Sequence, residues 1–218
     1  MKGLLIKDCR LMMGQKSFLG LSALMGVLYL GIYSDPTFAI MFVTIMCSIF
    51  SVSTLTYDEH ENGMAYLFTL PIRKKDYVLE KYVFYIMSTV ITGGVMFVLA
   101  CIAVQIRGLE TSWDDLCFGV LIAWFISTIL VSYMIPASLK FGIEKSRIVM
   151  GSAMAAIFLM VYLAIKISKS GNTDVERFMQ ALGNMSVGTV VLLLLIVAVV
   201  IVIISMIIAM KVIQSREF

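Results

Sequence analysis

The chain has 218 residues, of which 61% are hydrophobic and 14% are charged, and its mean hydropathy is +0.99. Charged residues make up about a quarter of a typical soluble domain, so this composition excludes a water-soluble protein. The net charge of +3 does not indicate nucleic-acid binding, because membrane orientation explains the basic residues better. We therefore expect an integral protein of the lipid bilayer without a nucleic-acid partner.

Six stretches without ionisable side chains approach or exceed the roughly 20 residues that a helix needs to cross a bilayer. Their apolar runs are continuous, which favours helices over the alternating pattern of a membrane barrel. The sequence predicts an all-α membrane protein with a single transmembrane domain over residues 1–218. Its six predicted spans are residues 17–34, 36–57, 82–106, 116–139, 148–165 and 187–210.

The basic residues predict the orientation of these spans. If both termini are cytoplasmic, 13 of the 17 basic residues lie in internal segments and 4 in external ones. Cytoplasmic loops of membrane proteins carry such an excess. We therefore expect both termini to be cytoplasmic in a multi-pass protein of a bacterial plasma membrane.

Residues 1–14 are short, mixed and basic, and no small-residue cleavage signal follows the first apolar run. We expect this segment to remain in the mature protein. Its apolar residues could share one side of a helix, with Lys7 and Arg10 on another. Lys2 and Asp8 interrupt that pattern. The segment is either an interfacial helix in the headgroup plane or only the positive flank of the first span.

The polar interruption at residues 57–77 contains an acidic cluster, a glycine, a short apolar pattern, a proline and a basic triplet in succession. Residues 58–70 predict a short cytoplasmic helix with acids in its first turn, where the helix dipole favours negative charge. Pro71 marks its end, because the residue before a proline is pushed out of the helical region. Met64, Leu67 and Phe68 form an apolar ridge at i, i+3 and i+4. We favour a docking helix over a solvated loop.

Two further segments carry candidate functional residues. Anionic headgroups would hold Arg73, Lys74 and Lys75, although ordinary positive-inside charge explains this triplet better when it is taken alone. Residues 173–183 predict an external amphipathic helix, either a lid near an external gate or an inert interfacial helix. Its apolar face consists of Val175, Phe178, Met179 and Leu182.

The sequences YDEHENG from Tyr57 to Gly63 and LPIRKKDYVLEKY from Leu70 to Tyr82 resemble the loop between the second and third transmembrane helices of ABC-2 type permeases. They are closest to a small six-helix branch that resembles exporters of antimicrobial or toxin peptides. The resemblance implies the type V exporter permease fold, with residues 58–70 as a coupling helix on a separate ABC ATPase subunit. It assigns the coupling role to Asp58, Glu59, His60, Glu61, Gly63, Met64, Leu67, Phe68, Leu70 and Pro71.

The sequence contains no motif for ATP binding or for zinc-dependent proteolysis. The sequence has no phosphate-binding GxxxxGK[ST] motif and no HExxH, and His60 is its only histidine. We expect no enzymatic activity, cofactor or metal here, and place ATP and Mg²⁺ in the ATPase subunit. The resemblance implies a homodimeric exporter of amphipathic peptides. The alternatives are an ABC exporter of small drugs or ions and a membrane sensor or assembly protein that transports nothing.

Overall fold

The computed structural model describes residues 2–59, 63–69, 72–142 and 187–215, together with isolated residues between 148 and 166. These ranges form helices and contain no β-strand, which confirms the predicted all-α fold for the described part of the chain. The helices are α1 (Lys2–Gly14), α2 (Lys16–Ile32), α3 (Thr37–Glu59), α4 (Gly63–Leu67), α5 (Lys74–Arg107), α6 (Trp113–Phe141) and α9 (Val187–Ser215).

Four of the described helices, α3, α5, α6 and α9, are long and apolar enough to cross a membrane. α1 and α2 meet at a bend of 68° and would together count as a fifth span. The predicted span at residues 148–165 and the predicted amphipathic helix at 173–183 lie outside the continuously described residues. The chain is therefore a multi-pass helical membrane protein, with up to five spans in its described part.

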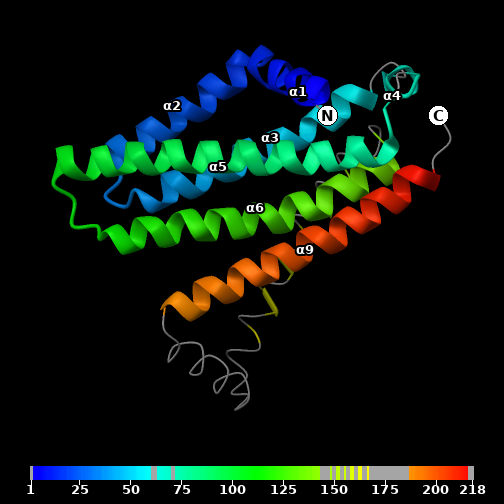
Figure 1. Cartoon of the computed structure of the whole chain (residues 1–218). Helices are drawn as coiled ribbons and strands as arrows, with labels where there is room; N and C mark the ends of the chain where they lie inside the picture. Colours follow the sequence, from blue (N-terminus) through cyan, green and yellow to red (C-terminus); the bar gives the residue numbers. More distant parts are fainter. Residues whose placement is uncertain are drawn as a thin grey trace.

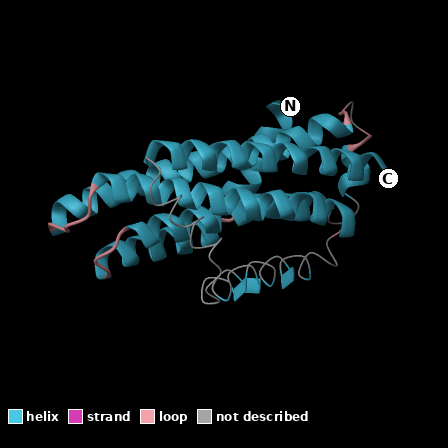
Figure 2. Ribbon diagram, turned by 90° about the horizontal axis from the view of Figure 1, so that it is seen from below, coloured by secondary structure: helices cyan, strands magenta, loops and turns pink. Residues whose placement is uncertain are grey.

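The long helices form a bundle in which α3 packs against α2, α5 and α6, while α9 packs against α6 and α5 (Figures 1 and 2). α1, α4 and the C-terminal end of α9 lie at one end of this bundle (Figure 1), which we call the α4 end. A buried apolar core at the α4 end joins residues of α1, α3, α4, α5, α6 and α9. A second core, nearer the far end, joins α2, α3, α5 and α6.

Three serine hydroxyl groups of α3 form hydrogen bonds within the helix. Ser48, Ser51 and Ser53 each donate to a backbone carbonyl three or four residues earlier. A hydroxyl in an apolar medium needs such a partner, because an unpaired one costs free energy. These side chains therefore contribute to helix packing in α3.

The far end is held by caps and by one arginine. Gly108, with a positive φ of 62°, ends α5, since glycine adopts the left-handed conformation without a steric penalty. Ser112 caps α6 by accepting from the backbone N–H of Asp115. The Arg107 guanidinium donates to the carbonyls of Leu30, at 2.7 Å, and Tyr33, at 2.6 Å, which ties the end of α5 to the end of α2.

Candidate functional site

A buried ion cluster joins three helices at the α4 end. Lys81 of α5 donates to Asp8 of α1, and its Nζ lies 2.7 Å from Oδ2 of Asp58 on α3. The side chain of Lys81 is 2% exposed and that of Asp8 is fully buried. Thr54 of α3 donates to Oδ2 of Asp8 at 3.2 Å and accepts from Lys81 at 3.1 Å. One ammonium group thus neutralises carboxylates from two other helices.

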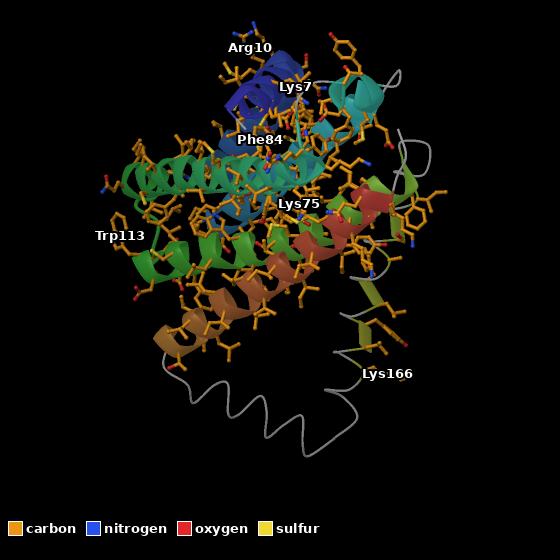
Figure 3. All side chains as sticks on the ribbon, turned by 45° about the vertical axis from the view of Figure 1, so that its right-hand side comes forward. Lys7, Arg10, Lys75, Phe84, Trp113 and Lys166 are labelled. Carbon is orange, nitrogen blue, oxygen red and sulfur yellow. The ribbon has the colours of Figure 1, made fainter. Side chains whose placement is uncertain are left out.

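Lys7 and Tyr77 complete this cluster. Lys7 of α1 donates to Oδ1 of Asp58, and its Nζ lies 3.3 Å from Oδ1 of Asp8. The Tyr77 hydroxyl of α5 donates to Oδ2 of Asp58 at 3.0 Å. Figure 3 shows Lys7 turned toward the bundle, whereas Arg10 of the same helix points away from it. A buried ion pair is stable only where geometry and hydrogen bonds offset desolvation. Asp58 meets that condition with two hydrogen-bond donors, Lys7 and Tyr77, and with the ion pair to Lys81.

Glu80 is the one carboxylate beside this cluster that lacks a partner in the described residues. It is fully buried, and neither of its carboxylate oxygens accepts a hydrogen bond. The neighbouring lysines, Lys7 and Lys81, are already shared by Asp8 and Asp58. Three carboxylates therefore face two ammonium groups, and Glu80 carries the excess.

The apolar ridge of the predicted coupling helix faces inward. Met64 is 3% exposed and Leu67 is 9% exposed, and both belong to the core at the α4 end, with Phe68 packed against it. The Phe68 ring meets the Tyr77 ring edge-on, with centroids 5.8 Å apart. The ridge packs α4 against the helices of its own chain. The apolar side chains that the sequence pattern assigned to docking on a partner are therefore buried within this chain. Tyr66, 73% exposed, is the large side chain that α4 presents outward.

The α4 helix is also shorter than the 58–70 helix that the sequence predicts. α4 covers Gly63–Leu67, while Asp58 and Glu59 form the last turn of α3. The buried hydrogen bonds and ion pairs of Asp58 extend α3 to that point. Gly63 returns the chain close to α3, because a Cβ at this position would lie 2.7 Å from the Asp58 carbonyl oxygen. No side chain fits there without displacing the backbone.

The remaining predicted site residues fall into two groups. Arg73 and Lys75 are exposed at the start of α5, where Arg73 is the N-cap, while Lys74 and Glu59 are half-buried. The others lie outside the described residues: His60, Glu61, Leu70, Pro71, Val175, Phe178, Met179 and Leu182. Their predicted roles in coupling and in an external gate remain predictions.

The ion cluster itself was not predicted from the sequence. Asp8 interrupts the apolar face of residues 1–14 in the sequence pattern, and in the structure it is fully buried. Lys81 was one of the 13 basic residues assigned to internal segments, and Asp58 was one of the acids assigned to the first turn of the 58–70 helix. The available signal was an aspartate on an otherwise apolar helical face, which requires a buried cation.

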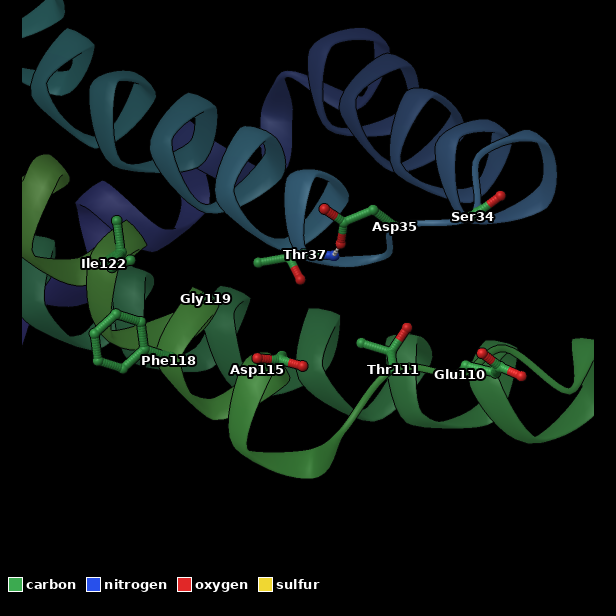
Figure 4. A pocket seen from close by; sticks show the side chains of 9 residues that line it. All are labelled: Ser34, Asp35, Thr37, Glu110, Thr111, Asp115, Phe118, Gly119 and Ile122. Atoms are coloured by element: carbon green, nitrogen blue, oxygen red, sulfur yellow. Dashed lines mark hydrogen bonds between the residues drawn. The ribbon is translucent and has the colours of Figure 1, made fainter. Parts of the chain in front are cut away.

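A hollow of about 450 Å³ lies at the far end, between the α2–α3 turn and the start of α6 (Figure 4). Asp35, Glu110 and Asp115 contribute carboxylates to its lining. Asp35 accepts from the backbone of Thr37 and Asp115 from the Ser112 hydroxyl, so both cap local turns. Within the described ranges, no group of three or more histidine, cysteine, aspartate or glutamate side chains is arranged to hold a metal ion.

Together, the long apolar helices and the bundle that they form define a polytopic helical membrane protein. A family model described as ABC-2 family transporter protein matches residues 3–214, and the chain belongs to this family. It is thus a permease component of a membrane transport system, a class that generally works with an ATPase subunit. No curated protein and no solved structure matches the chain.

Proposed function

We propose that this chain is the membrane subunit of an ATP-driven exporter and receives force from a separate ABC ATPase through residues 58–70. The observation that carries the proposal is the packing of α4 against the spanning helices. Met64 and Leu67 of α4 lie in one core with residues of α1, α3, α5, α6 and α9. A displacement applied to α4 must therefore move the ends of the spanning helices, since packed interiors resist compression.

The ion cluster supports this role by making the α4 end rigid. It bonds α1, α3 and α5 to one another at the α4 end, and the Phe68–Tyr77 contact connects it to the residues after α4. Buried charge pairs in low dielectric are strong and directional. The three helices would move as one unit under load, so that motion of α4 reaches α3 and α5 together.

Tyr66 is the side chain that we assign to the partner. It is the exposed aromatic of a helix whose other large residues are buried, and tyrosine is enriched among residues that dominate binding at interfaces. The α4 end would face the cytoplasm of a bacterial cell with both termini, in agreement with the charge distribution. ATP and Mg²⁺ would be bound by the ATPase alone.

We expect Tyr66→Ala to weaken ATPase binding by about tenfold or more, because truncation of an aromatic hot spot costs ~2 kcal/mol or more. Affinity for the co-expressed ATPase and its stimulated turnover would be measured in lipid nanodiscs. Tyr33→Ala, which truncates an exposed tyrosine at the far end, should leave both unchanged. If Tyr66→Ala and Tyr33→Ala bind the ATPase equally well, partner contact lies outside α4.

For the cargo, we propose an amphipathic peptide carried between two copies of this chain. A cavity of about 390 Å³ between α5, α6 and α9 is lined mainly by aliphatic side chains, with Tyr85, Thr89, Trp124 and Thr128 as its polar or aromatic members. Such a lining, without charge, suits the apolar face of a peptide.

In the same nanodisc assay, a cationic amphipathic helical peptide should stimulate ATP turnover severalfold. A sequence-scrambled peptide of equal charge, which lacks the apolar face, should not. Equal stimulation by both peptides, or stimulation only by small drugs or ions, would contradict a peptide cargo. Cross-linking between copies in the nanodisc would report the homodimer.

A further inference from the structure

The helices α1 and α2 form an arch over α5 (Figure 1), with the 68° bend between them at Gln15, and each of the two helices contacts α5. A cavity of about 330 Å³ lies beneath this arch. It is lined by Cys9, Met12 and Met13 of α1, by Leu19 of α2 and by one face of α5 from Phe84 to Thr92. Between the arch and α5 there is thus a space that the described residues of the chain leave unfilled.

The lining of this cavity is suited to an unbranched apolar chain. Its α5 face extends from Phe84 to Thr92, or about 12 Å along the helix, so the cavity follows the direction of α5. The lining hydroxyls of Ser88 and Thr92 donate to carbonyls of their own helix, at Tyr85 and Ser88. These two hydroxyl groups therefore have no free hydrogen to donate to a bound molecule. A molecule in the cavity would be held mainly by apolar contacts.

The charges beside the cavity are positive. Arg10, on the helical turn between Cys9 and Met13, is exposed and points away from the bundle (Figure 3). Lys16, the first residue of α2 at the bend, is also exposed. Among the described residues neither forms an ion pair, in contrast to Lys7 on the same helix, which pairs with Asp8 and Asp58. Two available cations therefore lie close in the chain to lining residues of the cavity, because Arg10 follows Cys9 and Lys16 lies between Met13 and Leu19.

We propose that the arch binds an anionic phospholipid from the leaflet at the α4 end, with one acyl chain in the cavity and the phosphate on Arg10 and Lys16. Basic residues adjacent to an apolar crevice between membrane helices match both parts of such a lipid. The bound lipid fills the space between the arch and α5 and thereby supports α1, whose Asp8 belongs to the ion cluster. This inference is independent of the exporter proposal and needs no ATPase.

The test is native mass spectrometry of the full chain released from detergent with dioleoyl phosphatidylglycerol or dioleoyl phosphatidylcholine, which share their acyl chains. Wild type should retain phosphatidylglycerol in preference to phosphatidylcholine. Arg10→Gln with Lys16→Gln should weaken phosphatidylglycerol binding by about 30-fold, from roughly fivefold for each basic residue near an anionic headgroup. Lys211→Gln removes an exposed lysine on α9 and should match wild type.

A second variant tests the cavity rather than the charge. Ile91 lines the cavity and is 60% exposed, so Ile91→Trp can fill it and should abolish retention of phosphatidylglycerol. Met87 lines the same cavity one turn earlier. If circular dichroism shows that Ile91→Trp is unfolded, Met87→Trp takes its place in the test. The proposal is overturned if the double glutamine variant binds phosphatidylglycerol like wild type, or if the filled cavity still retains it.

Discussion

Replacing Lys81 by methionine should destabilise the protein by about 3–5 kcal/mol, the range found when one partner of a buried ion pair is removed. Methionine keeps the length of the side chain but leaves Asp8 and Asp58 with Lys7 as their remaining cation in the cluster. Asp8 is fully buried and Asp58 is almost fully buried. Water therefore cannot solvate these carboxylates in place of the lost ammonium group. Unfolding in mixed micelles of increasing SDS content, followed by circular dichroism, would measure the loss.

Two further variants separate the buried charge from the lysine itself. Lys75→Met removes an exposed lysine less than two turns earlier on α5 and should change stability by no more than about 0.5 kcal/mol. Adding Asp8→Asn to Lys81→Met removes one unpaired carboxylate, so it should recover part of the loss. If Lys81→Met is as stable as Lys75→Met, the cluster does not hold the α4 end together.

The helices were predictable because each long apolar run has one stable form in a bilayer. Their ends were less predictable, since they depend on partners far away in the sequence. α5 begins at Lys74, eight residues before the predicted span at 82–106. Its first turns contain Tyr77, Glu80 and Lys81, whose burial against other helices turns an expected loop into helix.

The candidate site also combines features that the local sequence pattern predicts with features that depend on distant residues. Residues 58–70 were selected from their pattern, but the direction of the Met64–Leu67 ridge was not, because a three-residue apolar face packs equally well on its own chain or on a partner. Helical spacing alone cannot distinguish these cases. Asp8 was hidden for a similar reason: its partners Lys81 and Thr54 are 73 and 46 residues away.

Glu80→Gln should stabilise the protein by about 1–3 kcal/mol at pH 8. Glu80 is fully buried, accepts no hydrogen bond in the described part of the chain and adds a third carboxylate beside two lysines that are already paired. A buried carboxylate without a partner costs several kcal/mol, whereas an amide without one costs roughly 1–3 kcal/mol. Glutamine has the same shape, so packing is retained and the difference between these costs is gained. The mixed-micelle unfolding assay measures it.

Glu80→Met removes the polar group as well and should stabilise the protein at least as much as Glu80→Gln, because no amide is then left unsatisfied. Glu110→Gln, at an exposed carboxylate of the far end, should stay within about 0.5 kcal/mol of wild type. A destabilised Glu80→Gln would mean that the carboxylate is held by charge in the native state. If transport requires the Glu80 carboxylate despite the free energy that its burial costs, the stabilised variants should still bind the ATPase but no longer stimulate it. The strain at the α4 end would then be part of the transport cycle.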